Sequence, residues 1–191
     1  MARIPPLTPP YPPEIAAQLT RMMPVGVEPI ALFRTFARNL PMARAMTGWG
    51  GYELGRELSV GRREREIVID RTTARCGCEY EWGVHVAFFA ERVGLTREQV
   101  ASLTHGTADD ACWTDPRDRM LVELVDALHD AGDVDDGLWA RLADEFDAAQ
   151  ILDLVLLCGW YHAISFAARV ARVPSEPGGP TFVSVGVTDA R

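Results

Sequence analysis

The chain has 191 residues, 48% of them hydrophobic, and its formal net charge is −8 because 27 acidic side chains outnumber 19 basic ones. This length and apolar content suffice for the core of one domain. No stretch gathers lysine and arginine into a long cationic face, so neither nucleic acid nor an anionic membrane is expected as a partner. No apolar run that would span a bilayer and no signal segment is predicted, and we expect a cytoplasmic protein.

Four cysteines, at positions 76, 78, 112 and 158, are too few and too unevenly spaced for a disulfide framework in a chain of this length. A zinc ribbon needs two pairs of the CxxC type, whereas this chain has one CxC pair and two isolated cysteines. Cys112 and Cys158 are expected to be structural. The cysteine pattern therefore predicts thiols in a reducing compartment and no structural zinc. We also expect no cofactor.

The predicted elements are all helical. Six prolines among the first 13 residues exclude a helix there and predict an extended arm over 1–13. A single all-α domain is expected over 14–172 and an irregular tail over 173–191. Helical patterning recurs between proline and glycine breaks at 14–23, 29–49, 62–77, 78–94, 95–103, 115–132, 135–146 and 147–173.

Residues at the helix ends support these boundaries. Pro41 is expected to interrupt or restart the helix predicted over 29–49. Gly94 suits a helix C-cap, and Thr96 is a candidate N-cap with Glu98 or Gln99 in the first turn. Pro116 stands at a favourable first helical position, directly behind Asp115.

The sequence CGCEYEWGVH, at 76–85, carries the most informative polar residues of the chain. If 78–93 is one helix, then Cys78, Glu81 and His85 share a face, because 3.6 residues make a turn. Glu81 and His85 are four residues apart, close enough for the carboxylate to orient the imidazole or hold its proton. By itself such a pair is more often a surface pair than a catalytic one, and Glu66, which stands among arginines, would by itself belong to a solvated face.

The run REREIVIDRTTARCGCEYEWGVHVAFFAERVGLTREQV resembles the carboxymuconolactone decarboxylase family, which also contains the alkyl hydroperoxidase D proteins. The resemblance extends over about residues 30 to 172. It implies an all-α, alkyl hydroperoxidase D-like helical fold and a homo-oligomer, a trimer or hexamer and otherwise a dimer. In the hydroperoxidase branch a glutamate precedes a Cys-x-x-Cys-x-x-x-His motif. Glu66, Cys78 and His85 match its glutamate, first cysteine and histidine, whereas Glu81 stands where the family has the attacking second cysteine.

Three hypotheses follow. The first is an enzyme that uses Glu66, Glu81 and His85 for acid/base chemistry on a small organic acid or lactone: decarboxylation, isomerisation, dehydration or lactone opening. Tyr80, Trp82, Tyr161 and His162 are its expected substrate-binding residues.

The second hypothesis is a thiol-dependent alkyl hydroperoxidase, a peroxiredoxin-type antioxidant activity. Cys78 would be the active thiol, and Cys76 or an external thiol would resolve it. The third is a non-catalytic protein that binds a ligand, or a metal through Glu66, Glu81 and His85. We rank the first ahead of the second, because Glu81 breaks the cysteine pair that peroxide chemistry requires.

Overall fold

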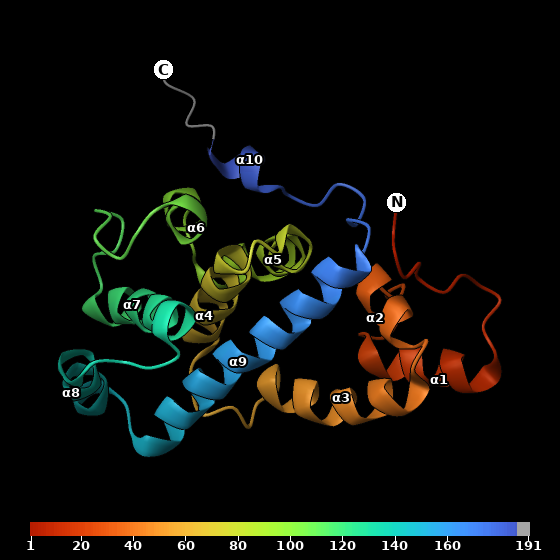
Figure 1. The fold of residues 1–191 in the computed structure, drawn as a ribbon, viewed down its shortest axis with the longest axis horizontal. Helices are drawn as coiled ribbons and strands as arrows, with labels where there is room; N and C mark the ends of the chain where they lie inside the picture. Colours follow the sequence, from red (N-terminus) through yellow and green to blue (C-terminus); the bar gives the residue numbers. More distant parts are fainter. Residues whose placement is uncertain (187–191) are drawn as a thin grey trace. The chain divides into compact units, whose positions relative to one another are not determined.

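The computed structural model describes residues 1–186, and no strand occurs among them, which confirms the all-α prediction (Figure 1). The α-helices are α1 (Pro13–Met22), α2 (Ala31–Phe36), α3 (Leu40–Glu53), α4 (Arg62–Arg75), α5 (Glu79–His85), α6 (Arg97–His105), α7 (Pro116–Ala131), α8 (Asp136–Glu145), α9 (Ala148–Ala171) and α10 (Phe182–Gly186). A π-helical turn, η1 (Val86–Ala90), and a 3-10 turn, η2 (Glu91–Val93), continue from the end of α5.

The helix-end signals in the sequence act as predicted. The Thr96 hydroxyl accepts a hydrogen bond from the Gln99 amide, and the Gln99 side chain accepts one from the Thr96 amide, so α6 begins with a capping box. The Asp115 side chain caps α7, and Gly94 ends η2 with a φ of 72°, in the left-handed region that favours glycine. The helix predicted over 29–49 is split, because the chain leaves the helix after α2 and restarts at α3 with Pro41 in its first turn.

The chain divides into two compact units, Met1–Leu58 with Ala167–Pro177, and Ser59–Phe166 with Gly178–Arg191. In the first unit, helices α1, α2 and α3 pack against one another. The Gln18 side-chain amide on α1 donates to the Ala43 carbonyl and the Thr47 hydroxyl on α3, at 3.1 and 2.7 Å. The proline-rich arm lies along this unit: the backbone amides of Arg3 and Ile4 donate to the Ala171 carbonyl.

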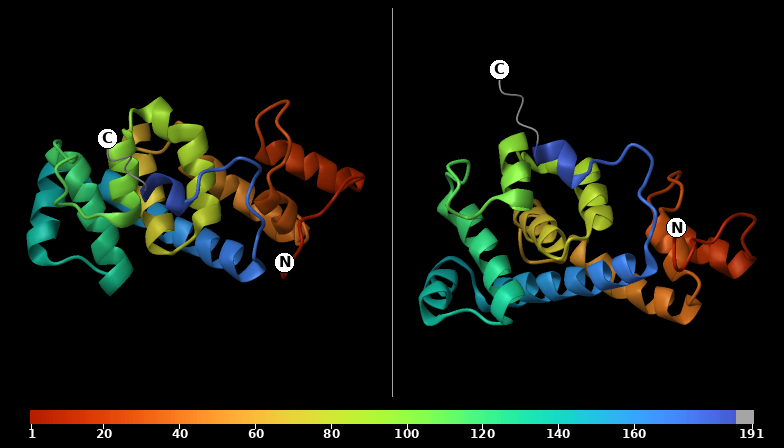
Figure 2. Two further views of the ribbon diagram at one scale, coloured as in Figure 1. Left: turned by 90° about the horizontal axis from the view of Figure 1, so that it is seen from above. Right: turned by 45° about the horizontal axis from the view of Figure 1, so that its top comes forward.

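Helix α4 is the central element of the second unit. It packs against α5, α6 and α7 (Figure 2), and every residue from Arg65 to Thr73 is buried. A helix that is buried on all sides has no solvent-facing stripe, so its polar residues must find partners inside the protein. The charged sequence of this helix therefore determines which polar contacts the unit contains.

Arg71 of α4 makes one such set of contacts. Its guanidinium forms two hydrogen bonds of 2.7 Å to the Asp126 carboxylate on α7. One Nη also donates to the carbonyls of Ser102, Leu103 and Gly106, at the end of α6. A planar guanidinium suits this role, because its donors lie in a fixed fork. Arg71 thus connects three helices and donates to carbonyls at the C-terminal end of α6.

Helix α9 and the tail differ from the expectations. Among the described residues, one helix, α9, is long and apolar enough to cross a membrane by length and composition, although the sequence pattern suggested none. Half of its most apolar stretch is buried inside the protein. The tail expected to be irregular contains α10, whose Phe182 amide donates to Glu79 Oε1 at 2.8 Å; residues 187–191 of that tail lie outside the described residues.

We predict that Arg71→Met lowers the free energy of unfolding by about 2–4 kcal/mol, because it removes the closest partner of the half-buried Asp126 carboxylate and a donor to three carbonyls at the end of α6. Arg141→Met is the matched control, since Arg141 pairs with Glu123 at an exposed position and its loss should cost no more than about 1 kcal/mol. Denaturant unfolding followed by circular dichroism measures both. Equal effects of the two substitutions would contradict this role of Arg71.

Candidate active site

The helix predicted over 78–93 begins one residue later than expected, with Cys78 as the N-cap residue of α5. Glu81 and His85 lie one turn apart on α5, and both side chains are buried. The π-helical turn η1 follows His85 directly, and the ring of Phe89 in that turn lies 5.3 Å from the His85 ring. Such turns inside helices are frequent at functional sites. The stripe proposed from the sequence therefore exists, with a half-buried aromatic ring beside its histidine.

Three groups surround the His85 imidazole, one against Nδ1 and two near Nε2. Glu66 Oε2 of α4 lies 2.8 Å from Nδ1. On the opposite edge, the Tyr161 hydroxyl of α9 lies 3.0 Å from Nε2, and Glu81 Oε1 lies 3.7 Å from the same nitrogen. The site therefore draws on three helices of one compact unit. Tyr161, proposed only as a pocket residue, bonds directly to the histidine.

The electrostatics of this group favour a charged imidazole. Burial opposes a charge on His85, but the carboxylates of Glu66 and Glu81 outweigh it and raise the pKa of His85 to about 10. Burial also opposes the charge on Glu66, yet His85 and Arg65 hold the pKa of that carboxyl below its ordinary value. At neutral pH the site thus contains an imidazolium that donates from Nδ1 to the Glu66 carboxylate.

The expectation that Glu66 by itself belongs to a solvated face is wrong. Its relative exposure is 0%, because α4 is enclosed by its neighbours. Arg65, the adjacent residue, is also buried and donates to Glu66 Oε1, at 2.8 Å from its Nε. The Arg65 guanidinium lies 5.5 Å from the centre of the Phe89 ring, an arrangement that stabilises a cation. Each Glu66 oxygen therefore has its own cationic partner.

Asp70 is a residue that the sequence interpretation missed. It lies one turn after Glu66 on α4 and is completely buried. Within the described part of the chain, neither of its carboxylate oxygens has a hydrogen-bond partner. Burial, with the charge of Glu66 added to it, raises the pKa of Asp70 well above its ordinary value, which favours the neutral form of this carboxyl in the folded protein. The i, i+4 spacing to Glu66 was the one available signal.

Cys78 is an unfavourable nucleophile in this setting. Its relative exposure is 1%, and burial raises the pKa of its thiol, an effect to which the nearby Glu81 carboxylate contributes. The thiolate is the reactive form of cysteine, so both factors reduce reactivity at neutral pH. All four cysteines are thiols.

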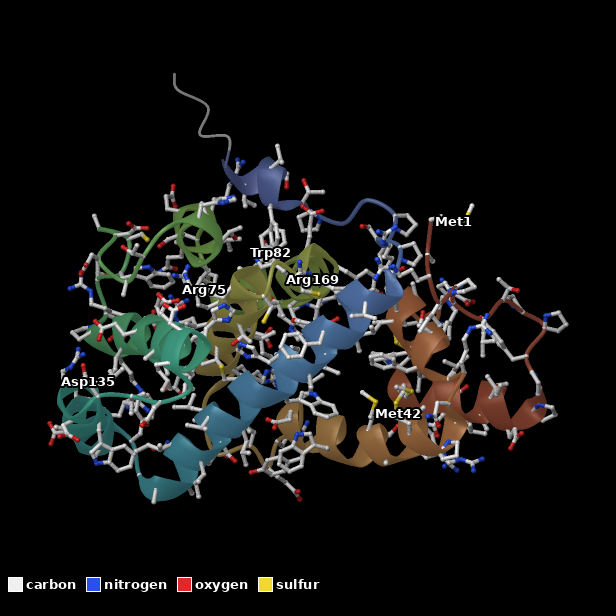
Figure 3. All side chains as sticks on the ribbon, in the orientation of Figure 1. Met1, Met42, Arg75, Trp82, Asp135 and Arg169 are labelled. Atoms are coloured by element: carbon white, nitrogen blue, oxygen red, sulfur yellow. The ribbon has the colours of Figure 1, made fainter. Side chains whose placement is uncertain are left out.

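The other predicted residues have different surroundings. Tyr80 and Trp82 are buried on α5, where Figure 3 labels Trp82. The Trp82 indole packs against Phe182 of α10 with 5.0 Å between ring centres. His162 does not face His85: its Nε2 lies 3.0 Å from His129 Nδ1 on α7.

Glu66, Glu81 and His85 do not converge on one point for a metal, because the two carboxylates bond to opposite edges of the ring. Cys76, His129 and His162 do converge.

We predict that Asp70→Asn stabilises the protein at neutral and alkaline pH. The Asp70 carboxyl of the unfolded chain is ionised above about pH 4 and must take up a proton on folding. The free-energy cost of this proton uptake grows by about 1.4 kcal/mol per pH unit until the pH reaches the raised pKa of Asp70. The difference in unfolding free energy between variant and wild type should rise with this slope from pH 4 upward. A difference that is independent of pH would show that Asp70 folds ionised.

Comparison with known proteins supports the resemblance. The model of the carboxymuconolactone decarboxylase family matches residues 41–117, the range that holds Glu66, Cys78, Glu81 and His85. No curated protein gives a significant match.

Two crystal structures share the fold. An uncharacterized peroxidase-related protein from Silicibacter sp. TM1040 has a TM-score of 0.78 and 16% identity, over 93% of each chain. A second, from Ralstonia eutropha JMP134, described as an alkylhydroperoxidase AhpD core, has a TM-score of 0.77 and 15% identity, over 96% of this chain and 97% of that one. Residues 41–117 thus match the carboxymuconolactone decarboxylase family, and the chain has the fold of these AhpD-like, peroxidase-related structures.

Proposed function

We propose that the protein is an enzyme that performs general acid/base chemistry on a small organic acid or lactone: decarboxylation, isomerisation, dehydration or lactone opening. The observation that carries this proposal is the composition of the Nε2 edge of His85, where a phenol lies at 3.0 Å and a carboxylate at 3.7 Å. A positioned acid and a positioned base beside one another are the parts that such proton transfers need.

The contacts suggest a role for each residue. Glu66, first considered as a partner in proton transfer, has one oxygen bonded to Arg65 and the other to His85, so we assign it as the positioning residue that keeps the imidazole charged. His85 then acts as the acid and donates from Nε2 to the oxygen that gains charge on the substrate. Tyr161 orients that proton.

Glu81 is the proposed base. Its Oε1 faces His85, and its Oε2 is buried and makes no hydrogen bond to any described residue. A buried acceptor without a partner costs free energy unless a substrate group supplies the missing donor. In the proposed reaction Glu81 removes a proton from the substrate while His85 protonates the substrate oxygen, so the net charge within the site is conserved.

Thiol-dependent reduction of hydroperoxides is the second candidate. It is favoured by the descriptions of the two similar crystal structures as peroxidase-related. In this reaction the Cys78 thiolate attacks the peroxide and an alcohol leaves after protonation. A second thiol then condenses with the resulting sulfenic acid to give a disulfide and water, and an external dithiol reduces the disulfide. The burial of Cys78 and its raised pKa oppose this chemistry.

We further propose a homo-oligomer, a trimer or hexamer or otherwise a dimer, with a small molecule as substrate. Large apolar side chains on α9 are exposed in the single chain: Leu152, Val155, Leu156 and Phe166. Exposed apolar side chains that cluster on one helix are typical of surfaces that other chains cover.

The first experiment follows proton exchange. Small keto acids and lactones are incubated with the protein in deuterated water, and deuterium incorporation and turnover are measured by nuclear magnetic resonance. We expect Glu81→Gln and His85→Gln each to lower kcat/KM by about 10²–10⁴-fold, the usual contribution of a positioned acid or base. Cys78→Ser should retain activity within a few-fold, roughly the effect of a side chain outside the reaction.

A parallel assay decides between the two candidates. The same proteins are mixed with an organic hydroperoxide and an excess of dithiol, and peroxide consumption is followed. Fast consumption that Cys78→Ser abolishes, without proton exchange on any acid or lactone, would contradict the acid/base proposal and establish the thiol reaction.

A pH profile tests the role of Glu66. Activity that needs the imidazolium should fall as pH rises through about 10, the pKa of His85. Glu66→Gln removes the carboxylate that raises the pKa of His85 most. We therefore expect the alkaline fall in activity to move to lower pH, while the fall in activity on the acid side of the profile stays where it is. A purely structural role for Glu66 would lower the rate at every pH without moving the alkaline fall. Circular dichroism shows whether the variant is folded.

A further inference from the structure

A second polar cluster lies in the same compact unit, apart from the residues proposed for proton transfer. It contains Cys76, the C-cap residue of α4, His129 on the last turn of α7, and His162 on α9. One ligand atom of each residue, the Cys76 sulfur and a ring nitrogen of each histidine, lies within 4.8 Å of the other two. Nothing in the acid/base proposal uses these residues.

The geometry points to a divalent metal site of the zinc type, formed by Cys76, His129 and His162, with a fourth position open to water. Thiolate and imidazole are the ligands that zinc prefers, whereas magnesium and calcium require oxygen ligands. With Zn–N bonds of about 2.0–2.1 Å at tetrahedral angles, two ligand nitrogens lie roughly 3.3 Å apart. His129 Nδ1 and His162 Nε2 are 3.0 Å apart, so a small outward movement would admit the ion.

The orientation of His162 supports a ligand role. Its Nδ1 lies 2.9 Å from the Cys158 carbonyl oxygen, one turn earlier on α9, and donates to it. In the neutral ring this leaves the lone pair on Nε2, the nitrogen that faces the cluster. Histidines that bind metals commonly donate their other ring N–H to a backbone carbonyl in this way, because it fixes both the tautomer and the direction of the ring.

The surrounding charges tolerate a cation. Arg75, which precedes Cys76, contributes positive charge close to His129. Its guanidinium is paired with Asp130 and lies 3.5 Å from Asp126 Oδ1, so the two carboxylates offset it. Cys76 would lose its proton to solvent on binding and contribute one negative charge. Cys76 is buried and both histidines are half-buried, so water can reach the open position from the histidine side.

The test uses the full-length protein after removal of metals with a chelator. Zinc is added, and stoichiometry and affinity are measured by competition with a chromophoric chelator; cobalt(II) is added separately to detect a thiolate-to-metal charge-transfer band. We expect one ion per chain, and for each of Cys76→Ser, His129→Gln and His162→Gln a loss of affinity of at least about 100-fold, beyond the usual effect of removing an indirect partner. The controls Cys112→Ser and His105→Gln should bind zinc as the wild type does.

A second measurement uses only the wild-type protein, so it does not require that any variant folds. Native protein is treated with an alkylating reagent, with and without zinc, and labelled cysteines are identified by mass spectrometry. Zinc should protect Cys76 selectively.

Three results would overturn the inference: no binding at micromolar zinc, binding that survives all three substitutions, or binding that is lost in Glu81→Gln instead. The pair of histidines would then share a proton in an ordinary hydrogen bond. None of these outcomes depends on the activity of the His85 site, so the two proposals fail separately.

Discussion

The arrangement of the second unit depends on one buried ion pair, between the Glu66 carboxylate and the His85 imidazolium. Two charges without solvent are costly unless each is paired and hydrogen-bonded. Here the second oxygen of Glu66 is bonded to Arg65, and the second nitrogen of His85 is bonded to Tyr161. The pair therefore fixes the relative positions of α4, α5 and α9 through directional contacts. It also keeps the histidine charged far above the pH at which a free imidazole loses its proton.

The chemistry follows from the constraint that the pair imposes. An imidazole with a carboxylate on each edge acts more readily as an acid than as a base, because both neighbours favour its proton. Burial makes a thiolate at Cys78 unfavourable, and the Glu81 carboxylate adds to that effect. A glutamate at position 81 thus changes the reaction that the site supports. The superfamily fold alone does not distinguish these activities, since one fold holds sites of different chemistry.

The CGC sequence separates two polar clusters rather than forming one. Gly77 has a φ of 63°, a conformation that is easy only for glycine, and it lets the chain turn sharply between α4 and α5. Cys76 thereby ends α4 beside His129 and His162, whereas Cys78 begins α5 on the side of Glu81. Two cysteines that are close in the sequence consequently have different neighbours and, in our proposals, different roles.

The helices, their caps and the shared face of Glu81 and His85 could be predicted from the sequence, because each depends on contacts within a few residues. Helix periodicity and capping are local, so α6 and α7 begin where Thr96 and Asp115 indicate. The family motif also identified Glu66, although the arginines around it suggested a solvated face. The short helix α10 was not predicted, since its five residues are held by distant partners such as Glu79.

Only the tertiary structure decided which side chains meet. Tyr161 and His162 are neighbours in the sequence, but successive residues of a helix point about 100° apart, so one bonds to His85 and the other to His129. The burial of Glu66 and of Asp70 depends on how α5, α6 and α7 cover α4, and no local pattern encodes that coverage. The sequence by itself determined the helices and the chemical groups; packing around α4 determined which groups are charged and which are brought together.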